Sequence, residues 1–237
     1  MKKIFIFLFT ILILTGCSQP QEITEKDKEE AATPTVTFLS IKNNFPKEII
    51  SILEKESGGK VSPLMVTRWF PDKNMPGSSS SKDVQENGIS ISSLQQNKAK
   101  DIFKKYYDKF YKDGYLIFLT NLNFDDDRNV IYDLAVIKAS DQYKIVKLIN
   151  TSALNYDITN KQIIEKLKEW GKSIPFRIVV VDNDRIEAEI LKMPNNVESF
   201  AIKIFDFCPD TVYQGADSLE KLTEGIKKDK YFWLWWD

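Results

Sequence analysis

The stretch PFRIVVVDNDRIEAEIL, residues 175–191, decides the fold class of this 237-residue chain. Its two apolar runs, PFRIVVV and RIEAEIL, have the composition of β-strands. Between them, Asp182-Asn183-Asp184 has the composition of a tight turn. Strands joined by so short a turn run antiparallel. The stretch therefore predicts an antiparallel hairpin.

Helical patterns flank this hairpin on both sides. Before it, Thr159 is followed three residues later by Gln162, which makes a capping box. The apolar face of that helix is Ile163, Ile164, Leu167 and Trp170. After the hairpin, residues 197–205 and 218–228 have helical patterns, and YFWLWW at residues 231–236 is a last strand.

The same alternation of strands and helices extends upstream. Helices are expected over residues 46–57, ended by Gly58-Gly59, and over 95–114. Strands are expected over PLMVTRWF (63–70), LIFLTNL (116–122), IYDLAVIK (131–138) and YKIVKLI (143–149). The order of these elements predicts an α+β fold, a mostly antiparallel sheet with helices packed on it.

The first 17 residues, MKKIFIFLFTILILTGC, have the features of a lipoprotein signal. Lys2 and Lys3 precede an apolar run that is too short to span a bilayer. The following Leu-Thr-Gly-Cys resembles the lipobox of bacterial lipoproteins. The resemblance implies cleavage after Gly16, a thioether lipid on Cys17 and acylation, for example with palmitate, of the new amino terminus. We expect a lipid anchor on the extracytoplasmic side of a membrane in the bacterial cell envelope.

The chain after residue 16 falls into three expected parts. Residues 17–35 are the lipidated cysteine and a polar, charged tether that we expect to be disordered. Residues 36–88 are an N-terminal α+β segment that begins with a strand, VTFLSI, and contains a long polar loop at 71–88. Residues 89–237 are a C-terminal α+β domain.

Composition excludes several kinds of site. Without Lys2 and Lys3 the chain has 31 basic and 34 acidic residues, which gives no attraction for nucleic acid. Lysines and aromatic residues alternate in the helix at 95–114, and this pattern favours an amphipathic helix over a surface for stacking bases. The absence of histidine excludes Ser-His-Asp catalysis and imidazole zinc sites. Asp125-Asp126-Asp127 is interpreted as a turn, and no metal or cofactor is expected.

The C-terminal stretch YFWLWWD places aromatic residues on both faces of its strand. Tyr231, Trp233 and Trp235 point to one side, and Phe232, Leu234 and Trp236 to the other. Because both faces are large and apolar, we expect a buried strand, interior and covered on both sides.

Four motifs in this half of the chain occur together. They are NYDIT at 155–159, FCPDTVYQG at 207–215, SLEKL at 218–222 and the terminal LWWD. This combination resembles the bacterial family named domain of unknown function 4253, over about residues 115–237. The resemblance implies a shared fold and makes the Cys-Pro-Asp stretch a family trait. It implies no activity, and no catalytic role is carried over.

The motifs supply the candidate site residues. The main candidate cluster comprises Cys208, Asp210, Gln214, Trp235, Trp236 and Asp237, with Asn155 and Asp157 as secondary candidates. One interpretation is structural: Pro209 stops a helix and Cys208 is buried as a small apolar residue. The other is a thiol that faces the acidic residues of the cluster. We favour the structural interpretation, since a helix carboxyl end among acids raises a thiol pKa.

The sequence therefore favours a lipid-anchored binding or interaction module. We do not expect an enzyme, and we expect the partner to be a protein rather than a small ligand. The alternative is a carboxylate-based hydrolase in which Asp210 and Asp237 converge on one pocket, Gln214 orients the substrate and Trp235 or Trp236 stacks on it. A thiol-dependent redox role for Cys208 is the weakest hypothesis, because Cys17 is lipidated and no second thiol remains.

Overall fold

The computed structural model describes residues 44–71 and 79–236. Within them lies a seven-stranded sheet in the order β1-β2-β4-β3-β5-β6-β7. Neighbouring strands run antiparallel except β3 and β5, which are parallel. The mostly antiparallel sheet predicted from the sequence is thus confirmed. The strands are β1 (Ser62–Pro71), β2 (Ser79–Gln95), β3 (Tyr115–Phe124), β4 (Val130–Lys138), β5 (Phe176–Val181), β6 (Arg185–Ile190) and β7 (Tyr231–Trp235).

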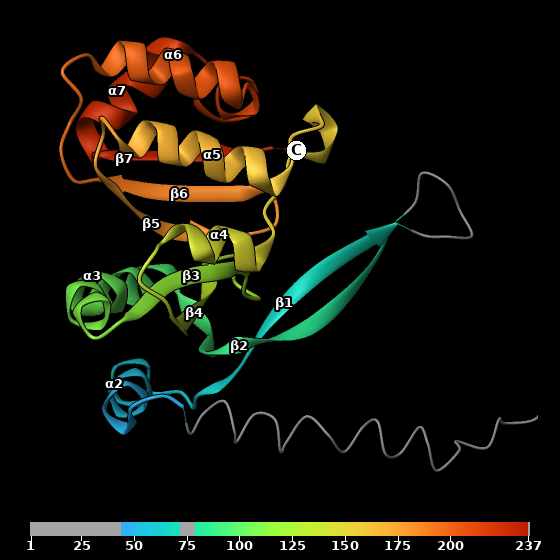
Figure 1. Ribbon diagram of the computed structural model, residues 1–237, viewed down its shortest axis with the longest axis vertical. Coiled ribbons are helices and arrows are strands. Elements are labelled where there is room, and N and C mark those ends of the chain that lie inside the picture. Colours follow the sequence, from blue (N-terminus) through green and yellow to red (C-terminus); the bar gives the residue numbers. More distant parts are fainter. Residues whose placement is uncertain (1–43, 72–78, 237) are drawn as a thin grey trace, which may run out of the picture. The chain divides into compact units, whose positions relative to one another are not determined.

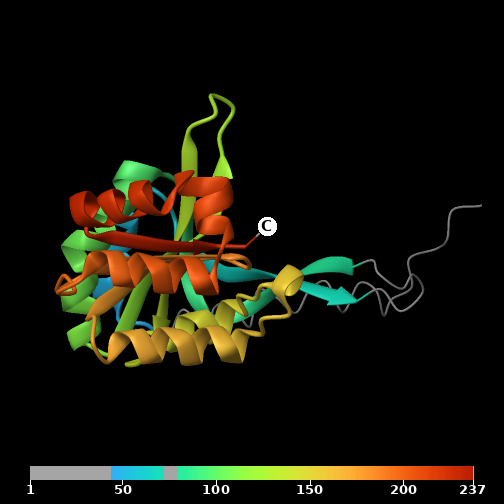
Figure 2. The same cartoon turned by 90° about the horizontal axis from the view of Figure 1, so that it is seen from above.

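Helices pack against the sheet in two separate apolar clusters (Figures 1 and 2). One cluster joins α2 (Lys47–Ser57) and α3 (Gln96–Lys112) to strand residues such as Ile117 and Leu134. The other joins four helices to alternate strand residues such as Phe118 and Ala135. These helices are α4 (Tyr143–Ile149), α5 (Asn160–Gly171), α6 (Val197–Phe207) and α7 (Leu219–Asp229), and two short turns, η1 (Leu154–Tyr156) and η2 (Thr211–Ala216), complete this side.

Several local predictions are confirmed by hydrogen bonds and backbone angles. The Thr159 hydroxyl and the Gln162 side chain form the capping box at the start of α5. The N–H of Asp182 donates to the carbonyl of Arg185 at 2.8 Å and closes the β5–β6 turn. Gly58 ends α2 with φ of +77°, a left-handed conformation that glycine adopts readily. The buried residues of α3 include Phe103, Tyr107 and Phe110, so three of its five aromatic residues face the core, while Tyr111 is exposed.

The strand expected at YKIVKLI is wrong, because these residues form α4. Ile145, Val146 and Ile149 are buried while Lys144 is exposed, which is a helical spacing. The carboxylate of Asp141 accepts the N–H of Tyr143 at 3.0 Å and so caps the first turn. The apolar pattern of a run of seven residues fits both a strand and a helix. Here the helix forms because its apolar face packs against the core.

The polar loop expected over 71–88 is wrong from Ser79 onward, because β2 begins there. The backbone pairing with β1, for example Val66 with Val84, overrides the low strand propensity of this serine-rich sequence. Residues 72–78 lie outside the described part. The boundary expected between residues 88 and 89 falls inside β2, so the two expected parts of the chain share a strand.

Burial of β7 alternates along the strand, and the interior position expected for it is wrong. Phe232, Leu234 and Trp236 are buried, whereas the residues between them are half-buried. β7 stands last in the strand order and pairs with β6 on one side. Large apolar residues on both faces of this strand therefore mark a covered edge rather than a central strand.

The N-terminal predictions fall outside the described residues. These are the signal peptide, Cys17, the tether to residue 35 and the strand VTFLSI, and Asp237 lies outside as well. In the part that the structure does describe, no helix has the length and apolar character needed to cross a membrane.

Candidate functional site

Cys208 lies at the carboxyl end of α6 and is fully buried. Its thiol is 3.0 Å from the carbonyl oxygen of Trp235, to which it can donate, and it accepts the N–H of Trp235 at 3.3 Å. Burial raises the pKa of the Cys208 thiol, against the opposing effect of the Thr211 hydroxyl. The neutral thiol is thus favoured, which agrees with the structural interpretation of this cysteine and argues against a nucleophile.

The Cys-Pro-Asp-Thr stretch caps the outer edge of β7. The N–H of Trp236 donates to the carbonyl of Asp184 at 3.0 Å, so the backbone groups of Trp233 and Trp235 face away from β6. Cys208 contacts those of Trp235, and the Thr211 hydroxyl lies 3.4 Å from the carbonyl of Trp233 and 3.1 Å from the Cys208 sulfur. Side chains thereby satisfy edge groups that a further strand would otherwise bind.

Gly215 explains the end of the same motif. A Cβ atom at this position would lie 1.9 Å from the Trp233 ring, because η2 packs its backbone directly on the indole. The guanidinium of Arg185 lies 5.9 Å from the centre of the same ring. The motif therefore holds Trp233 between η2 and β6 and completes the cover of this edge.

The remaining motif residues do not all gather at Cys208. Asp210 is buried and accepts a hydrogen bond from the Tyr156 hydroxyl at 2.5 Å, which raises the pKa of Tyr156 to about 12. Gln214 is exposed on η2, and Asn155 and Asp157 are exposed around η1. Asp237 lies outside the described residues, so the predicted pairing of Asp210 with Asp237 stays a prediction.

A hollow of about 350 Å³ lies beside this cap, where β1, the α4–η1 loop and the β5–β6 turn meet. It includes two of the residues predicted from sequence, Asn155 and Trp236, but not Cys208 or Asp210. Half of the ten lining residues are uncharged and polar, with three amides and two hydroxyls, and apolar atoms supply the larger share of the lining surface. The lining residues are Thr67, Arg68, Ile149, Asn150, Ser152, Leu154, Asn155, Asn183, Asp184 and Trp236.

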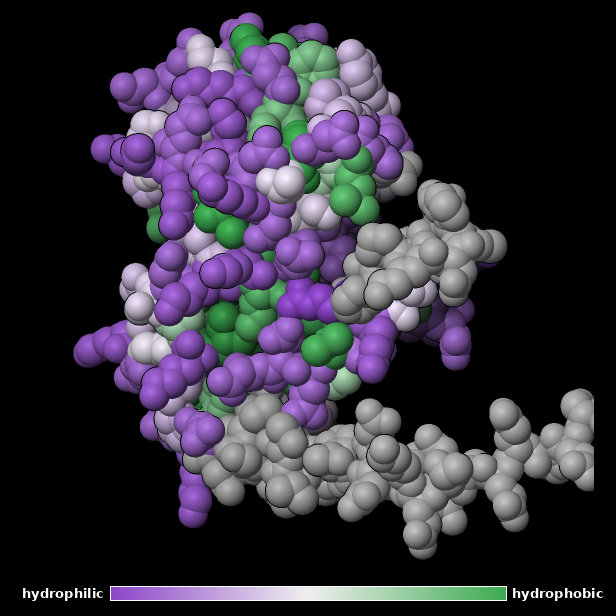
Figure 3. Space-filling view, turned by 45° about the vertical axis from the view of Figure 1, so that its right-hand side comes forward, coloured by the Kyte–Doolittle hydropathy of each residue, from purple (hydrophilic) through white to green (hydrophobic). Residues whose placement is uncertain are grey.

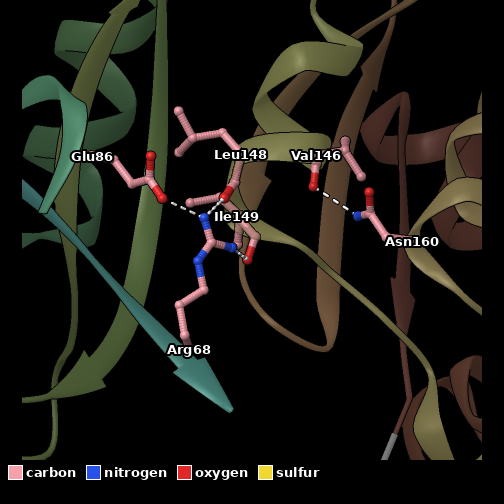
Figure 4. A network of polar contacts seen from close by, with 6 residues as sticks. All are labelled: Arg68, Glu86, Val146, Leu148, Ile149 and Asn160. Atoms are coloured by element: carbon pink, nitrogen blue, oxygen red, sulfur yellow. Dashed lines mark hydrogen bonds and ion pairs between the residues drawn. The ribbon is translucent and has the colours of Figure 1, made fainter. Parts of the chain in front are cut away.

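Arg68 fixes one wall of the hollow by binding the carboxyl end of α4 (Figure 4). Its guanidinium donates to the carbonyls of Leu148 and Ile149 and forms an ion pair with Glu86 at 2.5 Å. A cation at this position complements the negative end of the helix. The amide of Asn160 adds hydrogen bonds to the carbonyls of Val146 and Thr151 at 2.8 and 2.9 Å. The backbone on either side of Asn150, where the loop begins, is therefore fixed by the side chains of Arg68 and Asn160.

Asp182 fixes the opposite wall, the β5–β6 turn. Its carboxylate accepts the N–H of Asn121 at 2.5 Å, the N–H of Leu122 at 3.2 Å and the hydroxyl of Thr120 at 3.0 Å. Burial nevertheless raises the pKa of Asp182. The carbonyls of Asp182 and Asn183 accept bonds from Thr151 and Ser152 at 2.7 and 2.8 Å, so the turn and the loop are joined directly.

Large apolar side chains are exposed near the hollow. Leu154, which lines it, is 76% exposed, and Tyr156 two residues later is 38% exposed. Figure 3 shows one face of the molecule, on which apolar patches stand among mainly hydrophilic side chains. An exposed leucine at the wall of a concave site is a feature of binding surfaces.

Sequence reasoning missed Arg68, Asn150 and Asn183 as site residues. Asn183 was interpreted only as part of a turn, and Asn150 follows the segment that was interpreted as a strand. The signal in the sequence is the asparagine itself, because asparagine is common where a helix ends in the left-handed conformation. In the structure, Asn150 ends α4 with φ of +65°. Nothing in the sequence near Arg68 indicates its contacts with the end of α4, which lies about eighty residues away along the chain.

Comparisons with known proteins agree with these features. Residues 133–237 match the family described as Domain of unknown function (DUF4253), and residues 1–18 match the prokaryotic membrane lipoprotein lipid attachment site. The chain thus carries a lipoprotein lipid attachment site and a C-terminal region that matches DUF4253. This confirms the resemblance seen in the motifs, although the match begins at residue 133 rather than about 115. No curated protein and no solved structure matches the chain.

The DUF4253 match divides the hollow. Ile149 and the lining residues after it lie within the matched region, whereas Thr67 and Arg68 come from β1 outside it. In the described ranges, no group of three or more aspartate, glutamate, cysteine or histidine residues is placed to hold a metal ion. The hollow thus combines residues from inside and outside the matched region, and its lining offers amides, hydroxyls and apolar surface.

Proposed function

We propose that this protein is a binding module of the bacterial cell envelope, held by lipid on Cys17 at the extracytoplasmic face of a membrane, and that it binds its partner at the hollow. The observation that carries the proposal is the exposed side chain of Leu154 on a concave site of about 350 Å³ lined by three asparagine side chains. A concave site with apolar surface and a few placed polar groups is the general form of a binding pocket.

The rigidity of the hollow supports this role. Arg68 and Asn160 bind the carboxyl end of α4, and Asp182 binds the backbone of β3. Walls that are fixed before binding lose little conformational entropy when a partner arrives. The lipid anchor adds a second contribution, because it confines the hollow to the zone next to the membrane.

The alternative, a carboxylate hydrolase, has less support. Asp210 accepts a hydrogen bond from Tyr156 and is not among the residues that line the hollow. Asp237, the second carboxylate of that hypothesis, lies outside the described residues. The buried thiol of Cys208, whose pKa is raised by burial, likewise supports an edge cap rather than thiol chemistry.

The proposal is tested by photo-cross-linking of the full-length, lipidated chain in intact cells. A benzophenone amino acid replaces Leu154 in one variant and Leu191 in the other, since both leucines are exposed, at 76% and 55%, and only Leu154 lines the hollow. We expect a discrete adduct from position 154 and none from position 191. Equal labelling at both positions, or none at 154, contradicts the proposal.

A further inference from the structure

The charge of the hollow limits what it can bind. Its one cation, Arg68, already pairs with Glu86 and with two carbonyls at the end of α4, so its charge is compensated. The other charged lining residue is Asp184, which has an interaction partner of its own. A phosphate, a nucleic acid or a free carboxylate would therefore meet no uncompensated positive charge there. The hollow favours an uncharged ligand.

The polar lining matches the peptide group. Asn150 and Asn183 each bring an amide with one acceptor oxygen and two donor hydrogens. A peptide main chain offers the complementary N–H and C=O at every residue. Asn150 follows the fixed end of α4 and Asn183 lies within the fixed β5–β6 turn, so their backbones are placed before a ligand binds.

The apolar lining distinguishes a peptide from a sugar. Protein sites that bind sugars commonly present an aromatic ring whose face is open, and a planar side chain stacks on flat ligands in this way. The aromatic residue of this hollow, Trp236, is only 3% exposed, and its indole N–H donates to the carbonyl of Phe207 at 3.4 Å. Instead, Ile149 and Leu154 supply aliphatic surface that fits the side chain of a leucine-like residue.

We infer that the hollow binds an extended, uncharged peptide segment of a partner protein, with its main chain on the amides of Asn150 and Asn183 and one aliphatic side chain against Leu154 and Ile149. This inference rests on the proposed function, because it names the class of ligand for the same hollow. Hydrogen bonds to the main chain supply affinity and the apolar contact selects the side chain, as in other modes of peptide recognition.

The test uses the full lipidated chain in nanodiscs, immobilised for interferometry. The probes are a positional-scanning library of hexapeptides with acetylated and amidated ends, and, in parallel, oligosaccharides of N-acetylglucosamine. We expect binding by peptide pools whose fixed residue is leucine, isoleucine or valine, and weaker binding by pools whose fixed residue is aspartate or glutamate.

Two matched variants test whether the peptide binds at the hollow. Leu154→Ser removes the exposed aliphatic contact, and Leu191→Ser removes an exposed leucine that does not line the hollow. We expect Leu154→Ser to weaken peptide binding by about tenfold or more, as the loss of a leucine contact implies, and Leu191→Ser to leave it unchanged. Both side chains are mainly exposed, so neither change is expected to prevent folding.

Three results would overturn the inference. Binding of the oligosaccharide but no peptide, with the same dependence on Leu154, would show that the hollow is a sugar site; the proposed function would then stand. A preference for acidic peptides would contradict the argument from charge. Absence of peptide binding would also reject the inference, and cross-linking at position 154 in cells would then decide separately whether the hollow binds a partner.

Discussion

The two ends of the sheet are built in different ways. At one end, β7 is the last strand, and side chains of the Cys-Pro-Asp-Thr stretch bind the backbone groups on its outer edge. At the other end, β1 and β2 form a long antiparallel ribbon that extends away from the helices (Figures 1 and 2). Arg68 on this ribbon binds the carboxyl end of α4. The first end is capped, and the second carries part of the hollow.

The two ends also differ in their relation to the family match. The cap belongs to the region matched by the DUF4253 family, and the ribbon lies outside it. A motif that characterises a family can therefore stabilise the fold, while the proposed binding site, the hollow, depends partly on a segment outside the family match. Four substitutions separate the two ends, from the largest expected effect to the smallest.

Gly215→Ala is expected to lower the free energy of unfolding by about 3 kcal/mol or more, because the added methyl overpacks the site against the Trp233 ring. Gly225→Ala is the matched control. Gly225 lies within α7 with no atom within 4 Å of the position of its Cβ, so alanine is expected to stabilise by roughly 0.5–1 kcal/mol. Denaturant unfolding of both variants measures the difference. If the two behave alike, the packing of η2 on Trp233 does not stabilise the fold.

Arg68→Met is expected to lower the free energy of unfolding by about 1.5–3 kcal/mol, since it removes hydrogen bonds from a charged group and leaves Glu86 unpaired. Arg128→Met, in an exposed turn, is the control and is expected to change little. Hydrogen exchange should rise at residues 148–152 in the first variant alone. Unchanged exchange there would mean that Arg68 does not fix the wall of the hollow.

Thr211→Val keeps the volume of the side chain but removes the hydroxyl next to Cys208 and the Trp233 carbonyl. We expect a loss of about 1–2 kcal/mol, because the edge carbonyl loses a partner. Thr223→Val is the control, because the hydroxyl of Thr223 bonds only within its own helix, to Leu219 at 2.8 Å, among the bonds that the structure describes. Thermal or denaturant unfolding measures both variants. If they lose the same free energy of unfolding, the Thr211 hydroxyl has no special role in the cap.

Asp182 gives the smallest effect, a dependence on pH. Burial raises the pKa of its carboxyl, so its contribution to stability is present below its ordinary pKa and is lost as the pH rises through the raised value. Asp182→Asn should therefore flatten the decrease in unfolding free energy that the native protein shows above about pH 4. Asp126→Asn, an exposed carboxyl, controls for the loss of a charge. A parallel pH profile of wild type and Asp182→Asn would contradict the assignment.

Sequence patterns predicted the elements whose residues carry a local signal. The capping box at Thr159 and Gln162, the turn at Asp182 and the helix stop before Pro209 each depend on contacts within a few residues. The burial of Cys208 followed from the lack of groups that would stabilise a thiolate. Such features are determined before tertiary structure forms, so a sequence alone reveals them.

The predictions that failed depend on distant partners. YKIVKLI is a helix because the apolar core lies against one helical face, and Ser79 to Gly88 is a strand because β1 pairs with it. β7 is an edge because the neighbour on its outer side is the Cys-Pro-Asp-Thr turn rather than a strand. The hollow was missed for the same reason, since Arg68 meets α4 about eighty residues further along the chain.

The most direct test of the edge cap is the alkylation rate of Cys208 against pH, in the folded full-length chain and in denaturant. If Cys17 carries lipid as proposed, Cys208 is the remaining free thiol, and it is 0% exposed. The account predicts that the folded protein reacts only as fast as it unfolds, whatever the pH in the range where it is stable. Rapid reaction of the folded protein with an apparent pKa well below about 8.5 would contradict the cap and make the family motif a chemical site.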